Sequence, residues 1–262
     1  MKPTEECPIQ RFRDGRAVAE SDTVVTEARI ELDVNDGALC LAMLCLPQDL
    51  EALAVGFLIG EEALKRAEDL QTCVFSPAQR KVVVKGRFDK EVLRRIHLRW
   101  TRGTGCGGGG TGREMGGRDM APLGPGPVLD PEALLRLFRE FQAREGLWKR
   151  TGAVHACALS DGTDLLFRAE DVGRHNAFDK VIGMAALERR ALSDKLVFTT
   201  GRLTMEIVSK AVACRVPVLV SRSAVTSLAV QLGRAAGLTL VGFLRGRRMN
   251  VYTGVHRLSA AG

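Results

Sequence analysis

Hydrophobic and polar positions in the first third of the chain follow two periods in turn. Alternation with a period of two, typical of strands, runs through residues 23–34 and returns in residues 39–46 after the hairpin turn Asn35-Asp36-Gly37. Apolar residues then recur at helical spacing over residues 50–58, which predicts a helix with one buried face. Residues 70–99 continue with two short strands and a basic helix. The first part of the chain therefore has an α+β pattern.

The second half of the chain alternates between strand and helix patterns. Asp130-Pro131 begins a helix there, because aspartate is a good cap and proline suits the first helical position. Short strands alternating with helices of roughly 10–15 residues are typical of βαβ units and a parallel sheet. The expected strands are 153–159, 165–168, 196–200, 216–221, 238–243 and 250–253, and the expected helices between them are 176–190, 203–214 and 225–236.

These patterns divide the chain into four parts. Residues 1–20 are expected to be a loose leader, residues 21–101 a small α+β domain, and residues 128–262 a larger α/β domain. Between the two domains, residues 102–127 are rich in glycine and predict a mobile loop.

Composition and charge narrow the class of protein. Seven scattered cysteines, an odd number without a Cys-x-x-Cys pair, favour the reducing cytoplasm and argue against a disulfide framework or a structural metal site. No apolar run is long enough to span a membrane. The net charge of +7 suits an anionic ligand or partner. A nucleic-acid partner is not expected, because no nucleic-acid motif is present and aromatic residues for base stacking are scarce.

One cysteine lies in unusual surroundings. Cys106 stands in the run Gly103-Thr104-Gly105-Cys106-Gly107-Gly108-Gly109, with Arg102 and Arg113 nearby and no apolar residue close in sequence. A buried structural cysteine normally has apolar neighbours, and a thiol near positive charge ionises more readily. Two interpretations are open: a mobile arm that presents a nucleophilic sulfur, or a surface loop with an incidental cysteine.

Polar segments follow several of the strands in the second half, where ligands bind in open α/β sheets. Arg174 and His175 precede Asn176, which can cap the following helix, and the helix start suits an anion. Arg202 follows Gly201 at another strand-to-helix turn, and Ser221-Arg222-Ser223 has the same form. The alternative for each segment is an ordinary helix entrance held by salt bridges.

A second basic segment follows the last long strand. Phe243, Leu244, Arg245, Gly246, Arg247 and Arg248 place three arginines around a glycine. Because arginine binds phosphate through two parallel hydrogen bonds, this segment predicts a phosphate-binding patch. A solvated basic loop is the alternative. A Gly-x-x-x-x-Gly-Lys-Ser/Thr phosphate loop is absent from the sequence.

Taken together, these segments resemble the formate dehydrogenase accessory sulfurtransferase (FdhD) family over about residues 31–258. The most specific stretch is residues 170–183, Glu-Asp-Val-Gly-Arg-His-Asn-Ala-Phe-Asp-Lys-Val-Ile-Gly. The other matching segments, in the same order as in the family, are residues 53–58 with Glu61, Gly201-Arg202 with Glu206-Ile207-Val208 and Lys210, Ser223-Ala224 with Thr226, Gly242-Phe243 with Arg245, and residues 250–253.

The resemblance implies a fold and a function. The larger sheet is expected to be cytidine-deaminase-like, without zinc. The protein is expected to be a cytoplasmic sulfurtransferase that takes persulfide sulfur from a cysteine desulfurase on Cys106. It would pass this sulfur to a molybdenum bis(molybdopterin guanine dinucleotide) cofactor needed by formate dehydrogenase. The resemblance also implies a homodimer. We expect residues 243–248 to hold the cofactor, and Arg174, His175 and Arg202 to line the same pocket.

The chain departs from the family at one position. The common loop is Cys-Gly-x-Cys-Gly, but Gly109 stands here at the second cysteine, so Cys106 is the carrier candidate in a single-cysteine variant of the loop. This departure supports an alternative function, a chaperone that binds the molybdenum cofactor without sulfur chemistry at Cys106. A nucleotide-converting enzyme on a deaminase-like sheet is a second alternative, which the missing metal ligands disfavour.

Overall fold

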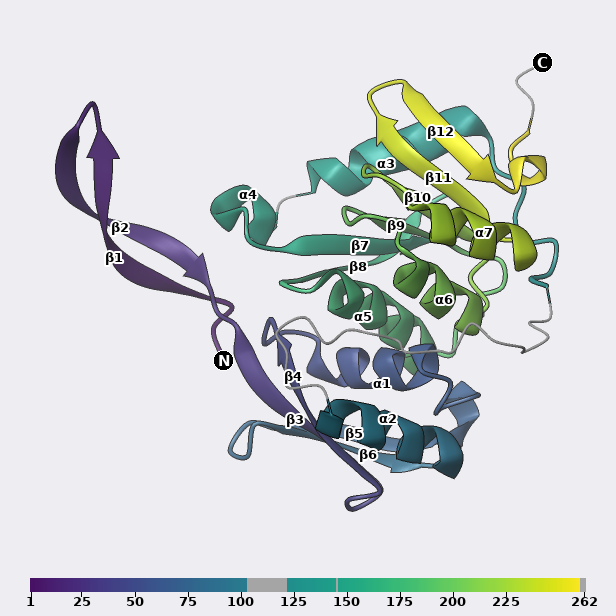
Figure 1. The fold of residues 1–262 in the computed structure, drawn as a ribbon, viewed down its shortest axis with the longest axis horizontal. Helices are drawn as coiled ribbons and strands as arrows, with labels where there is room; N and C mark the ends of the chain where they lie inside the picture. Colours follow the sequence, from purple (N-terminus) through teal and green to yellow (C-terminus); the bar gives the residue numbers. More distant parts are fainter. Residues whose placement is uncertain (103–121, 145, 260–262) are drawn as a thin grey trace.

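The computed structural model describes residues 1–102, 122–144 and 146–259, and these residues stack in layers (Figure 1). A four-stranded sheet is followed by helices of the N-terminal part, by helices of the C-terminal part, by a six-stranded sheet and by a last helix. This arrangement confirms the expected α/β fold, with a layered sheet, flanking helices and a smaller N-terminal α+β part.

The N-terminal part is built on the predicted hairpin. Its four strands are β3 (Ala28–Val34), β4 (Leu39–Cys45), β5 (Leu70–Ser76) and β6 (Lys81–Gly86), ordered β4-β3-β6-β5, and its helices are α1 (Leu50–Gly60), α2 (Lys90–Arg102) and the short η1 (Ala67–Asp69). Burial alternates along β3 and β4, so one face of the sheet packs on α1 and α2. Cys45 lies on the buried face, whereas Cys40 lies on the exposed face.

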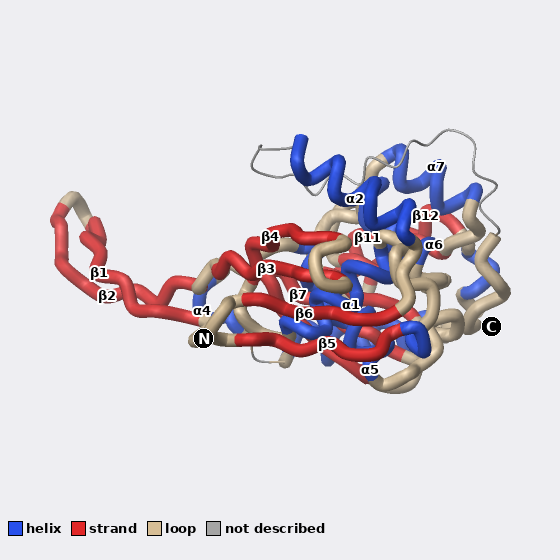
Figure 2. The backbone as a smooth tube through the Cα atoms, turned by 90° about the horizontal axis from the view of Figure 1, so that it is seen from below, coloured by secondary structure: helices blue, strands red, loops and turns tan. Residues whose placement is uncertain are grey.

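Residues 1–20 are not a loose leader. They belong to a hairpin of β1 (Thr4–Arg13) and β2 (Arg16–Val25), paired along its whole length, which extends away from the body of the molecule (Figure 2). The turn is Asp14-Gly15, and both residues have a positive φ, 50° and 76°. Asp-Gly is a strong signal for a two-residue hairpin turn. The prediction overlooked it because the strands on either side carry few apolar residues.

The larger sheet has the order β12-β11-β10-β9-β7-β8. Its strands are β7 (His155–Ser160), β8 (Leu165–Asp171), β9 (Leu196–Thr199), β10 (Val218–Ser221), β11 (Thr239–Arg245) and β12 (Arg248–Thr253). The predicted parallel pairing is correct for β9, β10 and β11, which helices connect. Strands β7, β8 and β12 pair antiparallel, because tight turns without a helix join β7 to β8 and β11 to β12.

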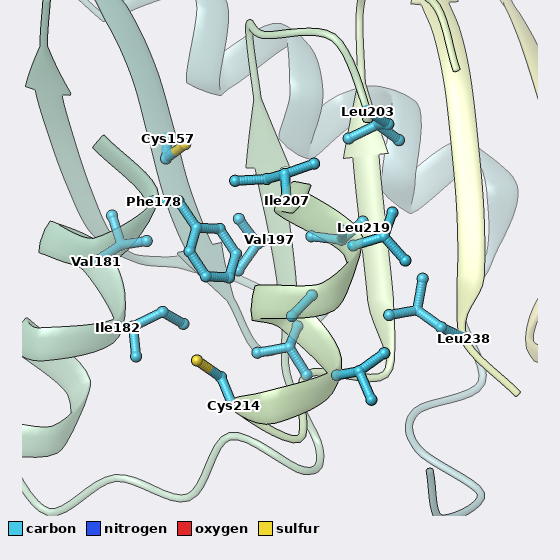
Figure 3. Packing of buried hydrophobic residues seen from close by; sticks show 14 of the residues in the cluster. Cys157, Phe178, Val181, Ile182, Val197, Leu203, Ile207, Cys214, Leu219 and Leu238 are labelled. Carbon is cyan, nitrogen blue, oxygen red and sulfur yellow. The ribbon is translucent and has the colours of Figure 1, made fainter. Parts of the chain in front are cut away.

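Helices cover both faces of this sheet. They are α3 (Pro131–Ala143), α4 (Leu147–Thr151), α5 (Arg174–Leu187), α6 (Met205–Ala213), α7 (Ser227–Ala235) and the short η2 (Val255–Arg257). On one face, Phe178 and Ile182 of α5 pack with α6, α7 and Val197 of β9 (Figure 3). On the other face, Phe138 and Phe141 of α3 pack on Phe198, the next residue of β9. Asp130 caps α3 as predicted, and the backbone N–H groups of Glu132 and Ala133 donate to its carboxylate.

Part of the predicted loop 102–127 belongs to the folded body. Arg102 ends α2, and residues 103–121 lie outside the described residues. Leu123 is buried, and its backbone N–H donates to the carbonyl oxygen of Ala236 at 2.9 Å. The buried side chain of Arg257 donates to the carbonyl oxygens of Gly124 and Pro125. Residues 122–127 are therefore anchored to the C-terminal domain.

Candidate functional site

The predicted site residues in the C-terminal domain gather at one edge of the six-stranded sheet. The parallel strands β9, β10 and β11 all end at this edge. The antiparallel strands β7 and β12 begin there, and β8 ends there. The sheet topology thus brings together Arg174 and His175 after β8, Arg202 after β9, Arg222 after β10, and the arginines between β11 and β12.

The start of α5 carries the first pair. His175 Nε2 lies 3.3 Å from Glu206 Oε2 at the start of α6, and an Arg174 guanidinium nitrogen lies 3.7 Å from the same oxygen. Burial, aided by the positive charges of Lys210 and Arg174, lowers the pKa of His175 to about 3. The imidazole is therefore neutral at physiological pH, and it is not an additional cation of the site.

Arg202 lies close to Arg174. Gly201 packs so tightly that a Cβ there would lie 3.0 Å from Cβ of Arg174. His155, at the start of β7, lies with its Nδ1 3.3 Å from Oγ1 of Thr200. Burial lowers the pKa of His155, and the charges of Arg174 and Arg202 lower it further. The structure thus brings the predicted Arg174, His175 and Arg202 into one neighbourhood, with Arg202 exposed.

The arginine segment begins at a distorted strand end. Phe243 has a φ of 51°, and the pairing of β11 with β12 shifts register between Gly242 and Arg245. The backbone N–H of Phe243 donates to the carbonyl oxygen of Ser223 at 3.0 Å instead of continuing the ladder. This bulge turns Arg245 toward β10, where its Nε donates to the carbonyl oxygen of Arg222 at 2.9 Å.

The remaining residues of this segment differ in their surroundings. Leu244 is only 1% exposed and packs in the core under α3, so its side chain is structural and cannot contact a ligand. Arg247 and Arg248 are exposed at the turn before β12, where Gly246 has a φ of 58°. A guanidinium nitrogen of Arg247 lies 3.4 Å from Oε1 of Glu132. Strand β9, which precedes Arg202, and strand β11, which ends at Arg245, are two strand spacings apart, or about 10 Å.

Much of the stretch 170–180, which the sequence pattern predicted to be part of a site, has a structural role instead. Lys180 is fully buried, and its Nζ lies 2.8 Å from Oδ2 of Asp171 and 3.1 Å from the carbonyl oxygen of Leu46 in the N-terminal part. Asn176 does not cap α5, since Gly173 occupies the cap position. Instead, its amide donates to the carbonyl oxygen of Leu44 at 2.9 Å and to Asp171 at 3.0 Å.

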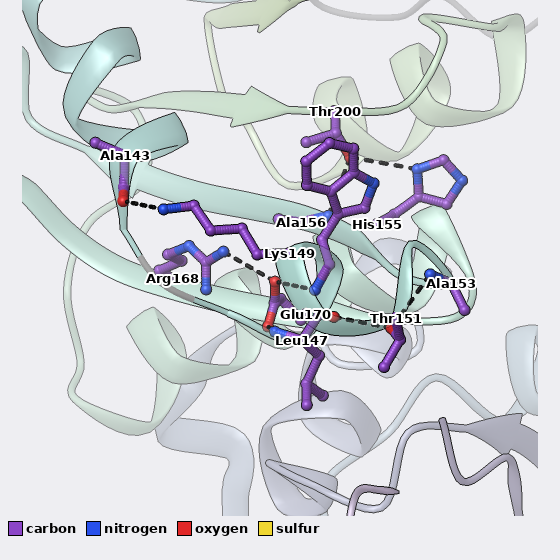
Figure 4. Close-up of polar contacts among 11 residues, drawn as sticks. Ala143, Leu147, Lys149, Thr151, Ala153, His155, Ala156, Arg168, Glu170 and Thr200 are labelled. Atoms are coloured by element: carbon purple, nitrogen blue, oxygen red, sulfur yellow. Dashed lines mark hydrogen bonds and ion pairs between the residues drawn. The ribbon is translucent and has the colours of Figure 1, made fainter. Parts of the chain in front are cut away.

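The structure also reveals a cleft that the sequence did not indicate. It lies beside α4, and its lining includes Trp148, Lys149, Arg168, Glu170 and Thr200. Figure 4 shows Arg168 and Glu170 close to Lys149. Its lining comes from α3, α4, β7, β8 and the segments after β9 and β10, so no short motif contains it. The helix α4 that carries Trp148 was itself not predicted. It spans only five residues, too few for a helical period to be recognised.

Four of the described cysteines are poor nucleophiles, whereas Cys106 lies outside the described residues. Burial raises the pKa of Cys45, Cys73 and Cys157 to about 12. Partial burial, together with the carboxylates of Asp33 and Glu31, also raises the pKa of the exposed Cys40. These four thiols are therefore protonated at neutral pH.

Two further findings concern the described part of the chain. No cluster of three or more histidine, cysteine, aspartate or glutamate side chains that could hold a metal ion occurs among its residues. None of its helices is both long enough and apolar enough to cross a membrane.

Comparisons with known proteins place these features in a family. Residues 25–259 match the model of the FdhD/NarQ family. The chain is 38% identical to the sulfur carrier protein FdhD of Wolinella succinogenes over 94% of this chain and 86% of the relative. It is 30% identical to the sulfur carrier protein FdhD of Bacillus subtilis over 98% of both chains.

A solved structure agrees with these matches. The crystal structure of a candidate formate dehydrogenase accessory protein from Desulfotalea psychrophila superposes with a TM-score of 0.80 at 28% identity, covering 98% of this chain and 100% of the other. Sequence and fold thus agree over nearly the whole length, and the chain belongs to the FdhD/NarQ family.

Proposed function

We propose that this protein is a sulfur carrier for formate dehydrogenase and that Cys106 carries the sulfur. The observation that supports the proposal most strongly is the match, over nearly the whole chain, to relatives named sulfur carrier protein FdhD. The contrast between cysteines points to Cys106. Burial keeps Cys45, Cys73 and Cys157 protonated, whereas Cys106 has only glycine, threonine and arginine near it in sequence.

The proposed donor is the persulfide of a cysteine desulfurase in the cytoplasm. The thiolate of Cys106 attacks the outer sulfur of the donor persulfide, a bond from Cys106 to that sulfur forms, and the donor leaves as a thiolate. No oxidant is consumed, because the sulfane sulfur keeps its oxidation level. Release of that sulfur as a sulfide ligand for molybdenum takes two electrons, which we assign to a small thiol. One thiolate attacks the inner sulfur of the Cys106 persulfide and displaces hydrosulfide, and a second thiolate cleaves the resulting mixed disulfide and returns Cys106 to its thiolate form. A second loop cysteine at the position of Gly109 is then not needed.

The proposed acceptor is the molybdenum bis(molybdopterin guanine dinucleotide) cofactor, bound as substrate at the sheet edge. Each of its two dinucleotides carries a pyrophosphate, and the edge offers Arg174, Arg202, Arg245, Arg247 and Arg248. The separation of about 10 Å between strands β9 and β11 suits two phosphate groups of one extended ligand better than a single phosphate. Phe243 and Gly246 have no charged side chain and offer only backbone groups to the cofactor. Leu244 is buried and is not part of the proposed binding site.

The carrier role is tested by loading. Purified protein incubated with a cysteine desulfurase and cysteine should gain the mass of one sulfur, about 32 Da, on the peptide that contains Cys106. Cys106→Ala should gain none there, while the matched variant Cys40→Ala, which removes another exposed thiol, should load like the parent. Sulfur on another cysteine, or none at all, would refute the assignment to Cys106. If guanine nucleotide still bound in that case, the cofactor chaperone would become the better proposal.

A further inference from the structure

The last helix of the N-terminal part, α2, concentrates positive charge. It holds five lysine and arginine residues and one glutamate, whereas residues 26–89 hold seven positive and eleven negative side chains. The helix packs on β4 and lies at the outside of the molecule (Figure 2). A partner with an acidic surface would therefore meet complementary charge on α2 and repulsion from much of the remaining N-terminal part.

The exposed side chains of α2 form one stripe along the helix. Lys90, Arg94 and Leu98 follow one another at a spacing of four residues, which places them on one face, and His97 lies beside them. All four side chains are exposed. A basic amphipathic helix can bind a membrane surface through its apolar face, but the apolar residues of α2, such as Ile96, are buried in the core of the N-terminal part. The exposed stripe thus suits a protein partner better than a lipid surface.

A groove adjoins the start of this stripe. It has a volume of about 510 Å³ and lies between α2, the turn from β3 to β4 and the segment that follows β6. Its lining combines apolar residues with cations, namely Ala38, Phe88 and Leu93 with Arg87, Lys90 and Arg94. The groove can therefore receive an apolar side chain that is flanked by carboxylates.

The cations of this surface are open to a new partner. Within the described ranges, Lys90 forms no ion pair. Arg94 pairs with Glu91 at 2.8 Å and Arg87 pairs with Asp69 at 2.7 Å, but both arginines are mostly exposed. Exposed ion pairs contribute little to stability, so the two arginines can exchange these partners for the carboxylates of another protein.

The covalent chain links this surface to the carrier cysteine. Helix α2 ends at Arg102, and Cys106 follows four residues later in the sequence. Four residues span at most about 14 Å even when fully extended. A protein that gives sulfur to Cys106 directly must therefore come close to the end of α2. The sheet edge that we assign to the cofactor belongs to the C-terminal domain, so a protein that only takes up the cofactor has no such need of α2.

We propose that the exposed stripe of α2 and the adjoining groove form the docking surface for the sulfur donor, an enzyme with acidic side chains beside its persulfide. Carboxylates of the donor pair with Arg87, Lys90 and Arg94, and this contact brings the donor persulfide within reach of Cys106. The inference rests on the proposed function, in which the donor is a cysteine desulfurase. It adds the place on the carrier where that enzyme docks.

Charge reversal on α2 provides the test. In the double variant Lys90→Glu with Arg94→Glu, the KM for the carrier in desulfurase-dependent loading of Cys106 should rise about tenfold, because charges at the rim of an interface set the rate of encounter. The loading rate at saturating carrier should stay the same. Raising the salt concentration from about 50 mM to about 300 mM should raise the KM of the parent protein but hardly that of the variant.

Two controls separate docking from general charge effects and from misfolding. Arg136→Glu with Arg139→Glu makes the same change in net charge at exposed positions of α3, and its KM should equal that of the parent. Glutathione persulfide is a small donor that needs no docking surface, so it should load all three proteins at equal rates. If the charge reversal prevents folding, Lys90→Gln with Arg94→Gln replaces it, and its KM should rise about threefold.

The outcomes distinguish this surface from the proposed function. An unchanged KM in the α2 variant, a parental KM that salt does not alter, or an equal effect of the α3 control would overturn the docking surface and leave the carrier role intact. Weaker binding of formate dehydrogenase but not of the desulfurase to the α2 variant would also overturn it.

If the desulfurase does not load Cys106 even in the parent, the carrier role fails, and binding then decides the docking surface. Desulfurase that binds Cys106→Ala, and that loses this affinity when Lys90→Glu and Arg94→Glu are added, would support the surface. Unchanged affinity, or no binding to either protein, would refute it.

Discussion

At the scale of single residues, the ammonium group of Lys180 is fully buried. It is held by Asp171, by the carbonyl oxygen of Glu170 and by that of Leu46. The second oxygen of Asp171 accepts from the backbone N–H of Gly173 at 3.0 Å. Removing one partner of a buried ion pair leaves the other charge buried without compensation and strongly destabilises the fold. We therefore interpret the pair as a fastening between the two parts of the chain, not as a reactive group.

Replacement of Lys180 tests this interpretation. Lys180→Met keeps the volume but leaves the Asp171 carboxylate buried without its counter-charge, so the free energy of unfolding should fall by about 3–5 kcal/mol. Urea denaturation followed by circular dichroism measures the change. Lys65→Met, which breaks an exposed pair with Asp89, should leave the free energy of unfolding nearly unchanged. The double variant Asp171→Asn with Lys180→Met should recover part of the loss. A cost of Lys180→Met no larger than that of Lys65→Met would contradict the role.

At the scale of elements, the contact between α1 and α5 depends on two glycines. A Cβ at Gly56 would lie 1.7 Å from the carbonyl oxygen of Asp179, and one at Gly183 would lie 1.8 Å from that of Ala52. Each helix backbone therefore rests directly on the other, and no side chain larger than a hydrogen atom fits between them. This close approach is what lets α5 serve as the interface between the two halves of the chain.

A methyl group at this crossing should force the helices apart. Gly183→Ala should lower the free energy of unfolding by about 1–3 kcal/mol or more, despite the better helix propensity of alanine, because the added carbon meets backbone that cannot rotate away. Gly60→Ala on α1 is the control, since its added carbon meets no atom closer than 3.3 Å, and it should have a much smaller effect. Thermal unfolding of both variants gives the comparison. Equal decreases in Tm for Gly183→Ala and Gly60→Ala would show that α1 and α5 can move apart to accept a methyl group, which would contradict this prediction.

The elements also show what the sequence could and could not predict. Alternation predicted β3 and β4 because one face of each packs on a core, and Asp130 predicted the start of α3 because capping is local. The pattern in residues 23–34 hid the break between β2 and β3, since both sides alternate. The antiparallel direction of β7 was not visible either, because strand direction depends on partners far apart in the chain.

The candidate site was predictable to a similar extent. Arginines after strand ends identified Arg174, Arg202 and Arg245 correctly as neighbours of the sheet edge, since sheet topology alone places them there. Sequence spacing could not show that Leu244 points into the core or that Lys180 is an internal fastening. Nor could it show that Trp148 meets Arg222, because that contact joins segments more than seventy residues apart.

At the scale of the whole molecule, the two halves share one interface and should unfold together. The backbone N–H of Leu46 donates to Asp171 at 3.0 Å, Lys180 donates back to the carbonyl oxygen of Leu46, and Asn176 donates to Leu44. Ala186 of α5 is buried in the core of the N-terminal part. If the halves separated, Lys180 and Asp171 would lose their hydrogen bonds to Leu46. Neither half should therefore be stable while the other is unfolded.

The two tryptophans allow this cooperativity to be measured, because Trp100 lies in the N-terminal part and Trp148 in the C-terminal part. Urea unfolding of Trp148→Phe, which reports through Trp100, and of Trp100→Phe, which reports through Trp148, should each give one transition. Circular dichroism measures the stability of each variant as a whole. Within each variant, the urea midpoint from fluorescence should equal the urea midpoint from circular dichroism. A fluorescence midpoint that precedes the circular dichroism midpoint in one variant alone would mean that this half unfolds independently. Lys180, Gly56 and Gly183 would then join two domains that fold independently. A substitution at one of these positions should separate the two transitions without lowering the urea midpoint of both.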